Sequence, residues 1–95
     1  MPKYIIERDV PDAGALTPEQ LQEVAVRSNG ALHQLGPSIQ WVESYVSADK
    51  ITCVYVAPDA GMVREHARIG GFPADRVLEV AAIIDPTTAE ANVRV

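Results

Sequence analysis

The chain has 95 residues, of which 47% are apolar, and its 8 basic and 13 acidic side chains give a net charge of −5. This length suits one small domain, and the apolar content excludes a disordered chain. The acidic balance excludes a nucleic-acid binder that works through bulk positive charge. The longest apolar run, residues 80–84, is far shorter than the roughly 20 residues that a membrane span needs.

Two further features predict a cytoplasmic protein. The single cysteine, Cys53, cannot form an internal disulfide, which fits a reducing compartment. The first residues lead directly into a strand-like segment, without the apolar stretch of a signal peptide. We therefore expect a cytoplasmic protein that partners neither a membrane nor a nucleic acid.

The first predicted elements are a strand and a long helix. Residues 3–9 are β-branched and aromatic, which is typical of a strand. Thr17 is a good helix N-cap, Pro18 suits the first helical position, and Gln20 completes a capping box. Residues at three- and four-residue steps predict the buried stripe of this helix: Leu21, Val24, Ala25, Ser28, Leu32 and Leu35. A Gly-Pro pair then ends it.

Three strands and one helix follow. Residues 39–46 and 51–56 are strand-like and are separated by a short polar segment, so they should pair as a hairpin. Asp59 is the expected N-cap of a second helix, which two consecutive glycines end. Residues 76–84 form the last predicted strand. The tail, residues 87–95, has no clear periodicity and is expected either to pack on a partner chain or to fray.

The order β-α-β-β-α-β predicts a ferredoxin-like plait, which is an α+β fold. We expect a single domain over residues 1–86, with a four-stranded antiparallel sheet and two helices on one face. The other side of the sheet, which we call the open face, is then left without helices.

Strand alternation divides the side chains of the hairpin between the two faces of the sheet. One set is small and mostly aliphatic and suits packing under helices, so the other set is expected on the open face. With one residue from the first strand, this predicted open face gathers acidic, aromatic and thiol side chains: Glu7, Trp41, Glu43, Tyr45, Cys53 and Tyr55. Such a patch indicates a partner or ligand site. A homodimer interface and a ligand cavity enclosed by two such faces are compatible interpretations.

No high-specificity catalytic motif occurs, so candidate chemistry rests on single residues. A carboxylate at Glu43 is costly to bury unpaired, which favours an interface charge, a metal ligand or a general base. Cys53 is either a small apolar filler or a thiolate ligand. His66 is either a packed, hydrogen-bonded helix histidine or a metal ligand. His33 is expected at the surface near its helix end.

Four segments carry a resemblance to a known family. They are Leu35-Gly-Pro-x-Ile-Gln-Trp-Val-x-Ser-Tyr45, Cys53-Val-Tyr-Val-Ala-Pro58, Val63-Arg-Glu-His-Ala67 and Gly70-Gly-Phe-Pro-Ala74. From Pro2 to Glu90 the chain resembles a family of small bacterial proteins of unknown function, some of which are described as nickel-binding. The resemblance implies a ferredoxin-like fold, usually a homodimer, in a soluble bacterial protein.

The leading hypothesis is a homodimeric binding protein that holds nickel, another divalent transition metal or a small ligand at the sheet-face cavity. The expected metal donors are Glu43, Cys53 and His66, with His33 as a further candidate. The expected lining of the cavity is Glu7, Trp41, Tyr45 and Tyr55. The runner-up is a cofactor-independent enzyme of the isomerase or monooxygenase type, with Glu43 or His66 as base. A purely structural dimeric module is the third hypothesis.

The register of the hairpin bears on the metal hypothesis. A turn centred on residues 48–49 pairs Glu43 with Val54, and Ser44 with Cys53. If both Glu43 and Cys53 lie on the open face, they are diagonal neighbours, close enough for one ion only if their side chains converge.

Overall fold

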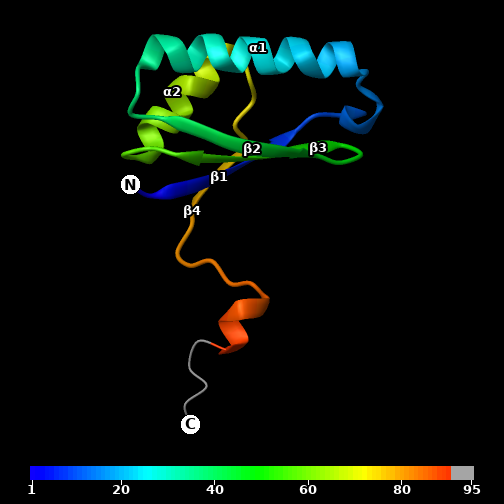
Figure 1. Ribbon diagram of the computed structural model, residues 1–95. Helices are drawn as coiled ribbons and strands as arrows, with labels where there is room; N and C mark the ends of the chain where they lie inside the picture. Colours follow the sequence, from blue (N-terminus) through cyan, green and yellow to red (C-terminus); the bar gives the residue numbers. More distant parts are fainter. Residues whose placement is uncertain (91–95) are drawn as a thin grey trace.

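Both helices of the chain cover the same side of a four-stranded antiparallel sheet (Figure 1). The computed structural model describes residues 1–90. Its elements are β1 (Lys3–Asp9), the 3₁₀ turn η1 (Ala13–Ala15), α1 (Pro18–Leu35), β2 (Gln40–Val46), β3 (Lys50–Val56), α2 (Ala60–Gly70), β4 (Arg76–Glu79) and the 3₁₀ turn η2 (Pro86–Glu90). The predicted ferredoxin-like plait is confirmed. Among residues 1–90, no helix is long and apolar enough to cross a membrane.

The sheet has the strand order β2-β3-β1-β4, so β2 and β4 are its edges. The hairpin register is the predicted one, with Glu43 opposite Val54 and Ser44 opposite Cys53. The register shifts between Trp41 and Glu43, because Val42 forms a β-bulge in β2. The bulge decides which side chains of β2 reach each face.

The sequence signals at the helix ends act as predicted. The Thr17 hydroxyl accepts a hydrogen bond from the backbone N–H of Gln20 at 3.1 Å, and the Gln20 side chain accepts one from the backbone N–H of Thr17 at 2.9 Å. These reciprocal bonds satisfy two donors that the first turn of α1 leaves free. Asp59 caps α2 by accepting from the backbone N–H of Met62 at 2.8 Å.

The core lies between the helices and the inner face of the sheet. The buried core side chains of β1 and β3 there are Tyr4, Ile6, Ile51, Cys53 and Tyr55. The placement of Cys53 and Tyr55 on the open face was therefore wrong. Alternation separates two sets of side chains but does not tell which set meets the helices. In β3, Ile51, Cys53 and Tyr55 fill the space under the helices, while Thr52, Val54 and Val56 lie on the open face.

In β2 the open-face prediction is correct for Glu43 and Tyr45 and wrong for Trp41. Residues directly opposite each other share a face, and Trp41 lies opposite the buried Tyr55. Because of the bulge at Val42, Trp41 and Glu43 point to opposite faces although they are two residues apart.

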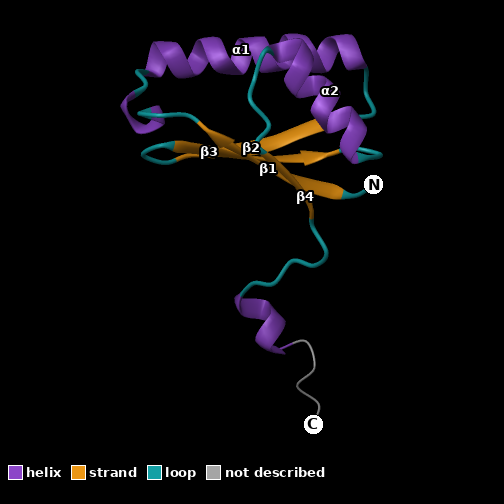
Figure 2. Cartoon of the chain, turned by 180° about the vertical axis from the view of Figure 1, so that it is seen from behind, coloured by secondary structure: helices purple, strands orange, loops and turns teal. Residues whose placement is uncertain are grey.

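The last strand is shorter than predicted. β4 ends at Glu79, not at residue 84, because its pairing partner β1 begins at Lys3. The backbone N–H of Val80 donates to the carbonyl of Lys3 at 2.8 Å, and the ladder stops there. The chain then leaves the sheet on the side away from the helices (Figures 1 and 2). Ile83 and Ile84 in this segment are 66% and 79% exposed.

Part of the expected tail lies outside the described residues. The structure places η2 at Pro86–Glu90 and describes nothing beyond it. The expectation that the tail packs on a partner chain or frays is therefore untested for residues 91–95.

Candidate functional site

A pocket of about 420 Å³ lies between the first half of α1 and the inner face of the sheet. We call it the α1 pocket. One group of lining residues is aliphatic: Val10, Leu16, Leu21, Val24, Val46 and Ile51. A second group is polar or aromatic: Arg8, Arg27, Ser28, Trp41, Tyr55 and Phe72. The volume falls within the roughly 300–1,000 Å³ of small-molecule sites.

The polar side chains of the α1 pocket gather around the rings of Phe72 and Tyr55, and we call this part its polar end. The start of α1 is held beside the hairpin turn, because the backbone N–H of Gly14 donates to the carbonyl of Ala48 at 3.0 Å. Leu21 and Ile51 lie near this end of their own elements, and Arg8 lies directly opposite Ile51 in the sheet. Ser28 lies further along α1 and reaches the Tyr55 end of β3 through the ring of His66. The α1 pocket therefore has a polar end around Phe72 and Tyr55 within a largely aliphatic lining.

The pocket exists because the first half of α1 is not fully packed. The predicted stripe of α1 does face the sheet, yet Leu21, Val24 and Ala25 remain only half-buried. Further along, Ser28 and Ala31 are buried. The apolar side chains of the first half of α1 therefore line the α1 pocket and do not pack closely against the sheet.

Arg8 is the most unusual residue of the pocket. It is only 3% exposed, and its three hydrogen-bond acceptors are all neutral. Nε donates to Cys53 Sγ at 3.4 Å, Nη2 donates to the Tyr55 hydroxyl at 3.5 Å, and Nη1 donates to the carbonyl of Pro73. Among residues 1–90, no carboxylate forms an ion pair with this guanidinium. A buried charge without a counter-charge is costly for the fold.

Arg8 was not among the predicted site residues, although the sequence carries a signal for it. Tyr4, Ile6 and Arg8 alternate along β1 and therefore share its inner face. A charged residue in phase with buried ones could have been noticed on that ground.

The aromatic ring of Phe72 holds two guanidinium groups at the polar end of the pocket. Arg8 Cζ lies 5.3 Å and Arg27 Cζ lies 4.7 Å from its centroid, within the range of cation–π contacts. The ring is also packed against Gly70, where a Cβ atom would lie 2.7 Å from Phe72 Cδ2. Gly70 therefore leaves the space that Phe72 occupies.

His66 ties the two helices together behind the pocket. It is fully buried, and its Nε2 lies 3.2 Å from the hydroxyl and 3.3 Å from the carbonyl oxygen of Ser28 in α1. Its ring packs 4.9 Å from that of Tyr55 and 5.9 Å from that of Phe72. Burial, and after it the nearby charge of Arg8, lower the pKa of His66, so its neutral form is favoured. This is the environment of a packed core histidine.

Tyr55 is a further ionisable group under the helices. Burial is the main reason that its pKa is raised above the usual value for a phenol. The hydroxyl therefore stays protonated at neutral pH and is available to hydrogen-bond.

The predicted metal donors do not come together within one chain. Glu43 lies on the open face, where its carboxylate accepts a hydrogen bond from the Tyr45 hydroxyl. Cys53 and His66 are buried on the helix side of the sheet, and His33 is exposed at the end of α1. Among residues 1–90, no three His, Cys, Asp or Glu side chains are close enough to hold a metal ion. The expectation that Glu43 and Cys53 share a face was wrong. Glu43 lies opposite Val54 on the open face, whereas Cys53 lies opposite the buried Ile6.

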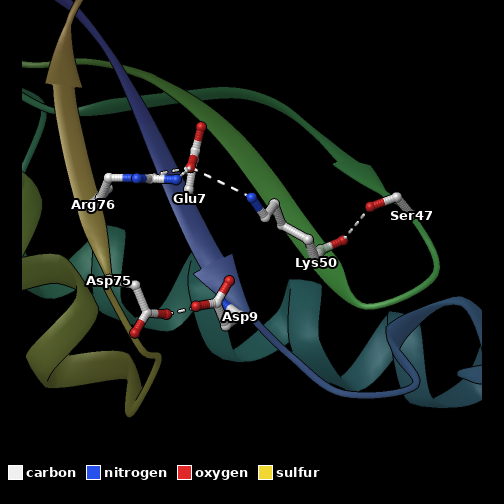
Figure 3. A network of polar contacts seen from close by, with 6 residues as sticks. All are labelled: Glu7, Asp9, Ser47, Lys50, Asp75 and Arg76. Carbon is white, nitrogen blue, oxygen red and sulfur yellow. Dashed lines mark hydrogen bonds and ion pairs between the residues drawn. The ribbon is translucent and has the colours of Figure 1, made fainter.

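Glu7 is part of a network of charges on the open face (Figure 3). Its Oε1 accepts hydrogen bonds from Arg76 Nε at 3.0 Å and Nη2 at 2.7 Å, and Lys50 Nζ lies 3.5 Å away. The hydrogen bonds from Arg76 are the main reason that the pKa of Glu7 is lowered. Glu7 lies on the predicted face but is already paired.

The rest of the open face includes an apolar row. Ile5 lies opposite Val54 on one side and opposite Leu78 on the other. Tyr45 and Leu78 are 56% and 46% exposed. The four predicted cavity residues are therefore divided, with Glu7 and Tyr45 on the open face and Trp41 and Tyr55 at the α1 pocket.

These features define a small ferredoxin-like α+β protein with a pocket under its helices and an uncovered sheet face. The chain belongs to the SCO4226-like family, because the family model described as "Nickel responsive protein SCO4226-like" matches residues 4–80. The predicted resemblance to a small bacterial family is thereby confirmed. No curated protein matches the chain.

A solved structure with the same fold comes from the protein that gives the family its name. The chain is similar to the crystal structure of SCO4226 from Streptomyces coelicolor A3(2), with a TM-score of 0.73 and 17% identity. The match covers 86% of this chain and 99% of that chain. At this identity the similarity shows the fold alone.

Proposed function

We propose that this protein is a homodimeric binding protein whose α1 pocket holds a small organic molecule. The α1 pocket itself is the observation that carries the proposal. Its volume, its largely apolar lining and its few polar groups at one end are the properties of small-molecule sites. A ligand cavity was predicted on the open face, whereas the α1 pocket lies on the helix side of the sheet.

A neutral apolar fluorophore tests the pocket. N-phenyl-1-naphthylamine should bind the wild-type protein in a ratio of one per chain, with a rise in its fluorescence. Ala25→Phe places a large side chain into the α1 pocket, so it should abolish this binding. Val26→Phe is the matched control, since Val26 is 64% exposed on the same helix and does not line the pocket. Equal binding by both variants would overturn the proposal.

The homodimer is supported by the open face and by the segment that leaves it. The apolar row and Tyr45 have no cover from the helices. The segment after β4, which contains the exposed Ile83 and Ile84, leaves the sheet on the same side (Figure 2). A second copy stacked on this face would cover the row, and it would also give those isoleucines a surface to pack on.

Nickel is a second candidate ligand, favoured by the description of the family. The donor set of one chain does not fit it, because Glu43 and the two buried donors are on opposite sides of the sheet. A nickel site in this protein would therefore have to form between two copies, with Glu43 contributing from the open face. Nickel accepts a carboxylate oxygen together with nitrogen donors, so Glu43 could be one of several ligands.

Calorimetric titration with nickel at pH 7.5 tests this second candidate. Glu43→Gln should weaken nickel binding, whereas Cys53→Ser should leave it unchanged, because Cys53 lies under the helices. Equal affinities in the wild type and Glu43→Gln would remove Glu43 from any metal site.

A further inference from the structure

The guanidinium of Arg8 has donor capacity that its surroundings do not use. An arginine carries five N–H donors, and Arg8 makes three hydrogen bonds. The contact to the Tyr55 hydroxyl is long, at 3.5 Å, and the thiol sulfur of Cys53 is a weak acceptor. The group is 3% exposed and borders the α1 pocket, so water does not replace the missing partners freely.

The missing counter-charge does not result from a shortage of acidic residues. The chain has 13 of them, and exposed arginines pair with two: Arg68 with Glu65 and Arg76 with Glu7. Within residues 1–90, the buried guanidinium of Arg8 has no such pair. An uncompensated charge in this position favours an anion that is brought in from outside.

A second positive charge reinforces the polar end of the pocket. Arg27 lines the pocket from α1 and stacks on the same Phe72 ring as Arg8. The hydroxyl groups of Ser28 and Tyr55 are at the same end. The rest of the lining is mainly aliphatic.

We infer that the α1 pocket binds an amphipathic organic acid, with its carboxylate on Arg8 and Arg27 and its apolar body against the aliphatic lining. The inference rests on the proposal that the α1 pocket is a small-molecule site. A planar guanidinium matches a carboxylate with two parallel hydrogen bonds, which are stronger than bonds between neutral groups. The bound acid would supply the counter-charge that Arg8 lacks.

Two probes with the same eight-carbon chain separate the head group from the apolar body. Octanoate and 1-octanol are titrated into the full-length protein by calorimetry at pH 7.5, where octanoate is ionised. We expect octanoate to bind about tenfold or more tightly than octanol, because charge-assisted hydrogen bonds form only with the carboxylate.

Three variants locate the head group. Arg8→Met keeps an unbranched apolar stem and removes the charged guanidinium, and should bring octanoate affinity close to that of octanol while octanol binding stays the same. Arg27→Gln, at an exposed position, should weaken octanoate severalfold. Arg64→Gln is the control, since Arg64 is exposed on α2 and does not line the pocket, and should bind octanoate like the wild type.

Thermal unfolding separates a ligand-binding role of Arg8 from a purely structural one. Because Arg8 is buried without a counter-charge, Arg8→Met should melt no lower than the wild type in the absence of octanoate. If Arg8→Met does not fold, the comparison of octanoate with octanol and the Arg27→Gln variant still decide the question.

The inference is overturned if octanol binds as tightly as octanoate, or if Arg8→Met retains the octanoate affinity. In either case, continued binding of N-phenyl-1-naphthylamine would leave the α1 pocket as a site for neutral molecules. Loss of that binding as well would overturn the proposed function together with the inference.

Discussion

His66 combines complete burial with a titratable ring, so its protonation opposes folding. Its lowered pKa in the folded chain means that the unfolded chain binds a proton at a higher pH than the folded one does. The stability that depends on neutral His66 is therefore complete above about pH 6.5, the usual pKa of histidine, and is lost as the pH falls below it.

We expect the melting temperature of the wild type to fall between about pH 7.5 and pH 5, and that of His66→Gln to fall less. Glutamine keeps a hydrogen bond to Ser28 within reach, so its cost at pH 7.5 should be about 1–2 kcal/mol or less. Circular dichroism melts across this pH range measure both effects. His33→Gln is the control and should follow the wild type, as His33 is exposed. Parallel profiles for the wild type and His66→Gln would contradict the prediction.

Single residues were predictable where one local rule decides their role. The caps at Thr17 and Asp59 follow from hydrogen-bonding geometry within one turn. The role of Arg8 depends instead on what β3, α1 and the segment after α2 bring to it, and no local pattern contains that information. A charged residue near a strand end is usually exposed.

At the scale of elements, the end of α2 is shaped by the ring that follows it. Gly70→Ala would add a Cβ atom where the Phe72 ring lies, and this ring also contacts the guanidinium groups of Arg8 and Arg27. We expect Gly70→Ala to lower the free energy of unfolding by about 1–3 kcal/mol, because the ring must move. Urea unfolding measures the change.

The matched control is Gly30→Ala in α1. No atom lies within 4 Å of a Cβ at Gly30, so alanine should raise the free energy of unfolding by about 0.5–1 kcal/mol through its higher helix propensity. Two glycine-to-alanine changes in helices should thus have opposite signs. A stabilised Gly70→Ala would show that Phe72 does not pack against α2 as described.

The bounds of most helices and strands follow from the sequence. The exception is β4, and its shorter length has a physical cause. Residues 76–84 have the composition of a strand throughout, yet only Arg76–Glu79 is one. A strand needs a neighbour for its hydrogen bonds, and β1 offers none beyond Lys3. The amino-acid composition of a segment carries no information on where its partner strand begins.

At the scale of the whole molecule, the open face predicts the oligomeric state. We expect the wild type to be a homodimer and Tyr45→Glu to shift it towards monomer. The new carboxylate would lie on the same face as Glu43 and would be unpaired in the interface. Light scattering after size exclusion at micromolar concentration measures the mass.

Val26→Glu controls for the added charge, since Val26 is exposed on α1, on the other side of the sheet. It should leave the dimer intact. A monomeric wild type at micromolar concentration would contradict the proposed dimer directly.

The plait itself was predictable from the order of its elements, but the location of the candidate site was not. The expected cavity combined Tyr45 with Tyr55, which the sheet separates. Alternation assigns residues to two sets, and only packing decides which set meets the helices. The bulge at Val42 adds a second uncertainty, because it reverses the phase of β2 relative to the residues before it.

The bulge at Val42 also hinders edge-to-edge pairing between copies of this chain. β2 is an edge strand, and a regular edge offers unpaired backbone groups to any other extended chain. Val42, 52% exposed, interrupts that row in the middle, and Trp41 Nε1 donates to Ser44 Oγ at 2.9 Å across the interruption. A chain without Val42 would keep its other side chains on the same faces, so it would still fold. Its uninterrupted edge would, however, favour the growth of fibrils.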